Sequence, residues 1–189
     1  SIPFLDEPHA PAARNALHNV LTRANLNRKW WWNDPDCILL RPDSELSLPE
    51  VQTAASIISL TGGMLLVSDD LQALPAERQK ILSQMLPPIP TSGIVLDWLD
   101  QHEPETILWR GQDFDGEYAM LGLVNWGKRP KDMVFSPQKF GLDGSYWLSC
   151  FWDGQVMQKS TNQEWRFDNV PAHGTMLAAV RKAVKTRPI

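Results

Sequence analysis

The chain lacks the features that mark membrane proteins and nucleic-acid-binding proteins. It has no apolar run near the roughly 20 residues that a membrane-spanning helix needs, so we expect no membrane association. Its 18 lysines and arginines stand against 22 aspartates and glutamates, which gives a net charge of −4. Proteins that bind a phosphate backbone carry a basic stripe, and this sequence has none. Nucleic acid is therefore not an expected partner.

Cysteine is also scarce, and its spacing argues against a metal-binding or disulfide-stabilised protein. Cys37 and Cys150 are the two cysteines, and neither stands at a spacing typical of a metal site or a disulfide framework. The four histidines show no ligand spacing either. We therefore predict no metal site and no cofactor. So little cysteine favours a reducing compartment, and with it the cytoplasm.

Tyrosine is rare, with two residues, whereas tryptophan is plentiful, with nine. Three tryptophans are adjacent in the run Trp30-Trp31-Trp32-Asn33-Asp34-Pro35-Asp36-Cys37. Pro35 fixes its own φ and keeps Asp34 out of the α region, so the two carboxylates are held in a stiff, non-helical geometry. Tryptophan faces stack on sugars, and carboxylates accept hydrogen bonds from sugar hydroxyls. The run therefore predicts a carbohydrate-binding loop, with a tryptophan-rich core edge and an Asn-Asp-Pro turn as the structural alternative.

The first half of the chain alternates between helical and strand patterns. Apolar residues at helical spacing predict an amphipathic helix over residues 13–24. Ser47-Leu48-Pro49-Glu50 is a capping box, and Gly62-Gly63 ends the helix that it begins. A third helix begins at Pro75 and ends at Pro87-Pro88.

Two short strands are expected between these helices. The tryptophan run with residues 37–40 predicts a buried strand and its exit loop, so that at least one tryptophan packs into the core. Residues 64–67 are all apolar, which is typical of a strand buried on both faces of a parallel sheet. Asp69 and Asp70 follow, and we expect a loop or N-cap role for either, with a place at the rim of the site as the alternative for one of them. Two strands do not make a stable parallel sheet, so this half is predicted to belong to a larger α/β domain.

After residue 90 the pattern changes to short strands separated by turns. Asp143-Gly144 and Asp153-Gly154 are hairpin-type turns, and the spacing of the strand-like runs indicates an antiparallel sandwich. The runs cover residues 118–126, 132–135, 145–152 and 175–180. The tryptophans of this half are expected in the core and at the interface between the halves, with a sugar-binding face as the alternative. They are Trp98, Trp109, Trp126, Trp147, Trp152 and Trp165.

Several of these segments resemble one protein family. They look like the C-terminal part of the melibiase-type alpha-galactosidases, which form glycoside hydrolase family 36 and are related to family 27. The matching segments are Trp32-Asn33-Asp34-Pro35-Asp36, Leu60-Thr61-Gly62-Gly63-Met64-Leu65-Leu66 and Ser68-Asp69-Asp70-Leu71, with weaker similarity at residues 13–21, 125–126 and 171–174. The resemblance implies an α/β plus all-β chain. Residues 1–90 would be the last strands and helices of a (β/α)8 barrel, and residues 91–189 an antiparallel β-sandwich.

The resemblance also implies an activity, the retaining hydrolysis of terminal alpha-galactosides by two carboxyl groups. In this family both catalytic aspartates precede the Asn-Asp-Pro-Asp motif. Asp6 and Glu7 are the acids before the motif here, and neither has the family's surrounding sequence. We therefore expect the C-terminal fragment of a glycosidase, with its catalytic carboxylates outside this chain. The alternative is a non-catalytic carbohydrate-binding or interaction module that uses the tryptophan-rich loop.

The resemblance points to a set of substrate-binding residues for the carbohydrate partner. Asp36 and Cys37 match positions that contact the sugar in related galactosidases, with Cys37 as a contact of shape. Trp32 and Asp34 complete the predicted set, and for Asp34 a role in fixing the loop is an equal alternative. An incomplete barrel would expose a sheet edge, so we expect self-association or association with the missing N-terminal part of the barrel.

Overall fold

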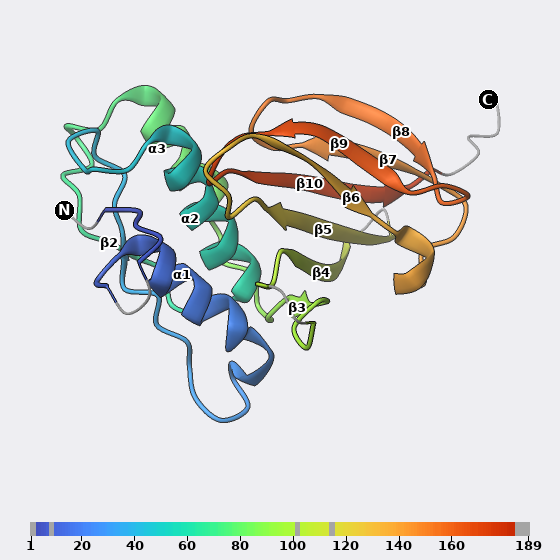
Figure 1. The fold of residues 1–189 in the computed structure, drawn as a ribbon, viewed down its shortest axis with the longest axis horizontal. Helices are drawn as coiled ribbons and strands as arrows, with labels where there is room; N and C mark the ends of the chain where they lie inside the picture. Colours follow the sequence, from blue (N-terminus) through green and yellow to red (C-terminus); the bar gives the residue numbers. More distant parts are fainter. Residues whose placement is uncertain (1–2, 8–9, 101–102, 114–115, 184–189) are drawn as a thin grey trace.

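The computed structural model describes residues 3–7, 10–100, 103–113 and 116–183. The helices lie at one end of the molecule and the large sheet at the other (Figure 1). The first half runs through α1 (Ala13–Thr22), β1 (Cys37–Ile38), α2 (Leu48–Thr61), β2 (Leu66–Val67) and α3 (Ala76–Gln84), and the short helix η1 (Ala24–Leu26) follows α1. Strands β1 and β2 pair in parallel. The predicted order of helices and strands is therefore confirmed in this half.

Helix α2 begins and ends at the residues that its sequence indicates. The Ser47 backbone N–H and hydroxyl donate to Glu50 Oε2 at 2.7 and 2.8 Å, so the predicted capping box is confirmed. Gly62 ends the helix with a φ of 63°. A Cβ at this glycine would also lie 2.5 Å from the carbonyl oxygen of Thr91, so glycine is required there by both conformation and space.

The second half forms a six-stranded sheet in the order β3-β4-β5-β10-β7-β8, with a separate pair, β6-β9. Each strand pair in these two sheets is antiparallel. The strands are β3 (Ile94–Val95), β4 (Thr106–Asp113), β5 (Gly116–Val124), β6 (Lys131–Phe135), β7 (Ser145–Cys150), β8 (Val156–Ser160), β9 (Trp165–Val170) and β10 (Thr175–Lys182), with the short helix η2 (Pro137–Phe140) after β6. The strands predicted from the four apolar runs correspond to β5, β6, β7 and β10.

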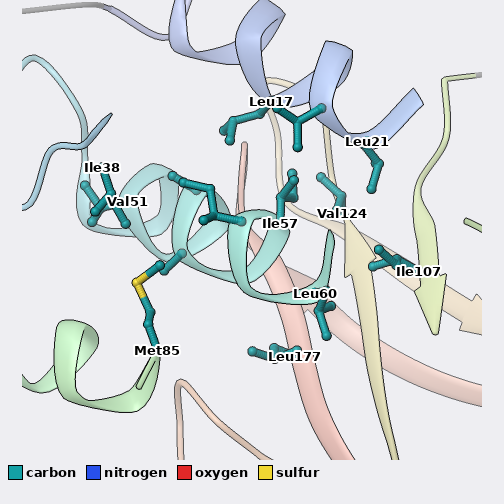
Figure 2. Packing of buried hydrophobic residues seen from close by; sticks show 14 of the residues in the cluster. Leu17, Leu21, Ile38, Val51, Ile57, Leu60, Met85, Ile107, Val124 and Leu177 are labelled. Atoms are coloured by element: carbon teal, nitrogen blue, oxygen red, sulfur yellow. The ribbon is translucent and has the colours of Figure 1, made fainter. Parts of the chain in front are cut away.

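The six-stranded sheet lies between two hydrophobic layers. One face packs on α2, where Leu17 of α1 and Leu177 of β10 approach the helix from opposite sides (Figure 2). The other face packs on β6 and β9, where Trp165 is fully buried with Phe135 and Leu148. Helix α2 is apolar nearly all round because it is covered on both sides. The two halves of the chain therefore share one continuous core.

Two predictions about the first half are wrong. The tryptophan run is not part of a buried strand, because β1 begins at Cys37 and the three rings are 80%, 41% and 62% exposed. Arg28 adopts a φ of 62° and its N–H donates to the carbonyl of Trp31, so this segment is a turn. Strand β2 is not buried on both faces either, since Met64 and Leu66 are exposed and the one strand that pairs with it among the described residues is β1.

The tryptophans of the second half divide into three groups, and Trp152 is partly buried against the core around α2. Trp109, Trp126 and Trp165 are buried, as predicted for the core. Trp98 and Trp147 are 38% and 49% exposed.

Within the described part of the chain, each helix is too short or too polar to cross a membrane.

Candidate functional site

An open pocket of about 680 Å³ lies between α1 and the loop that follows the tryptophan run. From the loop it is lined by Trp32, Asp34 and Asp36, which are three of the four residues predicted to bind substrate. Asn19 of α1 and Arg23, the residue that follows this helix, form the opposite wall. Cys37, the fourth predicted residue, does not line the pocket and is half-buried at the start of β1. The structure thus brings aromatic, acidic, amide and basic side chains together around one hollow.

The two aspartates stabilise the loop that presents them. Asp36 has a φ of 66°, a left-handed conformation that aspartate tolerates better than most residues. Its N–H donates to Asp34 Oδ1 at 2.9 Å, and Asp36 Oδ1 accepts the N–H of Cys37 at 2.7 Å. Asp34 therefore fixes the loop, which is one of the two roles that the sequence indicated for it. A carboxylate can accept about four hydrogen bonds, so both groups keep capacity for a ligand.

Two buried asparagines hold this loop in place. Asn33 Oδ1 accepts the indole N–H of Trp31 at 2.8 Å, and Asn33 Nδ2 donates to the carbonyl of Val20 in α1 at 3.2 Å. The Asn33 N–H donates to Asn27 Oδ1 at 2.7 Å. Asn27 Nδ2 in turn donates to the carbonyl of Thr61 at 2.9 Å. The loop is thereby tied to α1 and to the end of α2.

The tryptophan at the pocket is held by a cation. The Arg28 guanidinium lies 4.5 Å from the centre of the Trp32 ring, a cation–π contact, and Arg28 also donates to the carbonyl of Pro90. Trp32 nevertheless remains 62% exposed. A large, partly fixed aromatic surface is thus available beside the two carboxylates.

The other acids near the motif have structural partners. The side chain of Asp69 is fully buried, and its carboxylate accepts the N–H of Leu40 at 2.6 Å and a hydrogen bond from Arg41 at 3.0 Å. Asp70 Oδ1 accepts the N–H of Gln72 at 3.1 Å. The loop roles expected for both aspartates are therefore confirmed.

Asp6, one of the two acids before the motif, is held by cations. It pairs with Lys128 at 2.9 Å and with Arg14 at 3.1 Å. The hydrogen bond from Lys128 holds the pKa of Asp6 below its ordinary value, and the charge of Arg14 acts in the same direction. A general acid needs the opposite shift to stay protonated near neutral pH, so this environment does not suit Asp6 to that role.

The site includes four residues that the sequence did not indicate as pocket walls or loop anchors, namely Asn27, Asn33, Asn19 and Arg23. Asn33 stands inside the recognised motif, but nothing local distinguishes it as a buried anchor. The bonds of Asn27 reach 34 residues ahead to Thr61 and 65 residues ahead to the hydroxyl of Ser92. Contacts at such separations leave no periodic pattern in a sequence. Asn19 and Arg23 lie among the apolar positions of the helical pattern over residues 13–24, and helical spacing alone does not indicate a pocket wall.

No protein-family model matches the chain. Its fold is similar to three solved glycosidase structures, each 15% identical to it. Alpha-galactosidase I from Mortierella vinacea has a TM-score of 0.69, with 89% of this chain and 44% of that chain covered. An alfa-galactosidase from Saccharomyces cerevisiae, solved with raffinose, has a TM-score of 0.67, with 90% and 51% covered. A GH27 β-L-arabinopyranosidase from Geobacillus stearothermophilus has a TM-score of 0.70, with 92% and 43% covered.

The likeness defines a fold class. Nearly all of this chain superposes on part of an alpha-galactosidase-like glycoside hydrolase, and the chain spans about half the length of these proteins or less. The resemblance suggested by the Asn-Asp-Pro-Asp motif is therefore confirmed at the level of the fold.

Proposed function

We propose that this chain is the C-terminal part of a retaining glycoside hydrolase that acts on terminal alpha-galactosides, of the type found in family 36. Residues 1–90 would supply the last strands and helices of a (β/α)8 barrel, and residues 91–189 the β-sandwich. The fold likeness to alpha-galactosidases over about 90% of the chain, but only about half of theirs, supports this placement.

The observation that carries the proposal is the convergence of Trp32, Asp34 and Asp36 on one open pocket. Asp36 would accept hydrogen bonds from sugar hydroxyls, which are stronger to a charged acceptor than to a neutral one. Trp32 would offer its exposed ring to the C–H face of the sugar. Asp34 would keep Asp36 in its left-handed conformation, and Cys37, which does not line this pocket, is not part of the proposed contact set.

The exposed surfaces of the first half support a barrel that continues beyond these residues. Strands β1 and β2 are two residues long each, and such a parallel pair is unstable without neighbouring strands. Trp30, Met64 and Leu66 are large apolar side chains in contact with solvent. Further barrel strands and helices, supplied by a longer chain or by a partner, would cover them.

The catalytic pair would lie on those further strands. Retaining glycosidases place two carboxyl groups about 5–5.5 Å apart, one as nucleophile and one as acid and base. Among the described residues, the carboxylates that line the pocket are Asp34 and Asp36, and each accepts a backbone N–H of its own loop. This arrangement suits binding and positioning of the sugar.

The test compares the 189-residue chain with the complete gene product, using a chromogenic alpha-galactoside. We expect no hydrolysis by the chain alone and turnover by a longer product. In that longer product Asp36→Asn should lower kcat/KM at least 100-fold with the fold retained, whereas the matched change Asp70→Asn should not. Turnover by the chain alone would overturn the fragment proposal, and near-normal kinetics of Asp36→Asn would remove Asp36 from the site.

A second candidate function is a non-catalytic carbohydrate-binding or interaction module. The exposure of all three adjacent tryptophans favours it, because monomeric proteins rarely leave such an apolar surface uncovered without a partner. The comparison of the 189-residue chain with a longer gene product also separates the glycosidase from the binding module. Saturable binding of raffinose by the chain, with no longer gene product in the native organism, would make this the leading function.

A further inference from the structure

A pocket of about 330 Å³ lies between the C-terminal part of α2 and the six-stranded sheet, and it shares no lining residue with the pocket beside the tryptophan run. Its lining comes from α2, from residues 84–89 at the end of α3, from β4, β5 and β10, and from the turn that follows β7. We infer that this pocket binds an uncharged aromatic molecule of one or two rings that carries one hydrogen-bonding group, such as a phenol or an indole. The inference goes beyond the proposed function and does not depend on it.

The position of the pocket follows from the register of the strands. Leu60 of α2 covers Gly122 of β5, where a Cβ would lie 2.7 Å from Leu60 Cδ1. The next residue on this face of β5 is Met120, which pairs with Trp109 of β4 on one side and with Ala179 of β10 on the other. All three side chains line the pocket. The pocket therefore begins one step along the sheet from the place where α2 covers it.

Small side chains on both walls keep this part of the core open. Ala55 and Ser59 of α2 lie one helical turn apart and line the pocket from above. Ala179 lines it from the sheet. Pockets for small molecules have volumes of about 300–1,000 Å³, and this one is at the lower end of that range. Its size thus suits a ligand of one or two rings.

The two tryptophans of the pocket are held in place, and their N–H groups are already used by the protein. Trp109 Nε1 donates to Thr91 Oγ1 at 2.9 Å, and Trp152 Nε1 donates to Ser56 Oγ at 3.1 Å. The Trp109 ring also lies over Gly111, where a Cβ would approach its Cη2 to 2.1 Å. What both tryptophans offer a ligand is therefore fixed, apolar ring surface, which limits the ordering cost of binding.

The remainder of the lining favours an aromatic ligand over a saturated one. Tyr118 and Phe151 add two further rings, and Met85 and Met120 add two thioethers. Contacts between aromatic rings, and between sulfur and an aromatic ring, stabilise a complex beyond the burial of apolar area. A saturated ring of the same size gains the burial alone. The lining therefore discriminates between two ligands that differ only in aromaticity.

The charges of the pocket favour an uncharged ligand. Arg181 and Asp113 are its two charged residues, one of each sign, and they form an ion pair in which Arg181 Nη1 donates to Asp113 Oδ1 at 3.2 Å. The Arg181 guanidinium also lies 5.0 Å from the centre of the Tyr118 ring. A charged ligand would compete with this pair and leave one of its members without a counter-charge. Ser59 and Gln84 supply a hydroxyl and an amide to one uncharged hydrogen-bonding group.

The test is titration of the full chain with indole and with phenol, followed by calorimetry and NMR. Cyclohexanol tests the need for an aromatic ring, and benzoate tests the exclusion of charge. We expect saturable binding of indole and phenol with a Kd of about 1 mM or tighter, and binding of cyclohexanol and benzoate weaker by about fivefold or more.

Two variants fill the pocket from opposite walls. Ala179→Leu fills it from the sheet and Ser59→Leu fills it from α2, and each should weaken the binding of indole by about tenfold or more. Ser59→Leu keeps the inference testable if Ala179→Leu does not fold, which circular dichroism of each variant checks. Ala76→Leu is the matched control, because Ala76 is an exposed residue of α3 outside the pocket, and it should bind indole as the wild type does.

The contrary outcomes are separable. The inference is overturned if the folded chain shows no saturable binding of indole or phenol, or if both filling variants bind indole as the wild type does. Cyclohexanol bound as tightly as phenol would overturn the selection for an aromatic ligand. Binding of indole that is lost in Trp32→Ala and kept in both filling variants would overturn the inference too, and would assign the ligand to the tryptophan run.

Discussion

His173 Nδ1 lies 2.8 Å from Glu50 Oε1, and this contact joins the two halves of the chain. The other oxygen of Glu50 belongs to the capping box of α2, so one carboxylate both begins the helix and binds the sandwich. The imidazole is also stacked on Phe4, with 4.6 Å between the ring centres. The carbonyl of His173 accepts a hydrogen bond from Thr53 of α2 at 2.7 Å. The first turns of α2 are thus fixed directly to the turn that precedes β10.

Replacing Glu50 should therefore destabilise the protein more than loss of a cap alone. Glu50→Ala removes the bonds to Ser47 and leaves the partly buried imidazole of His173 without this hydrogen-bond partner, so we expect a loss of about 2 kcal/mol. Urea unfolding followed by circular dichroism measures this. Glu77→Ala provides the control, because Glu77 is the first-turn acid of α3 and is exposed, and it should change stability by less than about 0.5 kcal/mol. Equal effects of the two changes would contradict the bridging role of Glu50.

The elements set by local chemistry could be predicted from the sequence. The capping box at Ser47 and the glycine at position 62 fix the ends of α2 through contacts within a few residues. Strand-like apolar runs between turn signals likewise indicated β5, β6, β7 and β10. Strands β4, β8 and β9 were missed, because exposed polar or charged side chains interrupt their runs, and β3 was missed because it is two residues long.

The candidate site was predicted only in part, for a physical reason. Tryptophan is usually buried, so three of them in a row indicated a strand in the core. The left-handed turn at Arg28 and the hydrogen bond from Trp31 to Asn33 place the run on the surface instead. Asp34 and Asp36 could be identified because Pro35, which lies between them, restricts the backbone locally. The buried anchors Asn27 and Asn33 depend on segments distant in the chain, and a single sequence does not reveal those partners.

Removal of the Asn33 side chain should loosen the loop without unfolding the protein. Asn33→Ala leaves the indole N–H of Trp31 and the carbonyl of Val20 without their partner, which costs about 1–3 kcal/mol. We expect a lower unfolding midpoint and faster amide hydrogen exchange over residues 31–36. Asn162→Ala, at an exposed turn of the sandwich, should leave both unchanged. Unaltered exchange in Asn33→Ala would contradict the anchoring role.

The ion pairs of Asp6 predict a dependence of stability on pH. Its pKa is lowered in the folded protein from an ordinary value of 3.8, so the unfolded chain binds the proton more readily. The stabilisation is complete above that ordinary value and is lost as the pH falls through the lowered folded pKa. Asp6→Asn should therefore be less stable than the wild type at pH 7, and the difference should shrink by pH 3. Urea unfolding at both pH values measures it, and a difference that grows on acidification would contradict the assignment.

The exposure of Trp32 predicts that its replacement separates binding from stability. The ring is 62% exposed and its described ring contact is with Arg28, so Trp32→Ala should cost no more than about 1 kcal/mol. The same change removes the aromatic wall beside Asp36, and binding of methyl alpha-galactoside at that pocket should weaken at least tenfold. Trp30→Ala is the matched control, since Trp30 is 80% exposed and does not line the pocket. Equal binding by the two tryptophan variants would show that Trp32 does not contact the sugar.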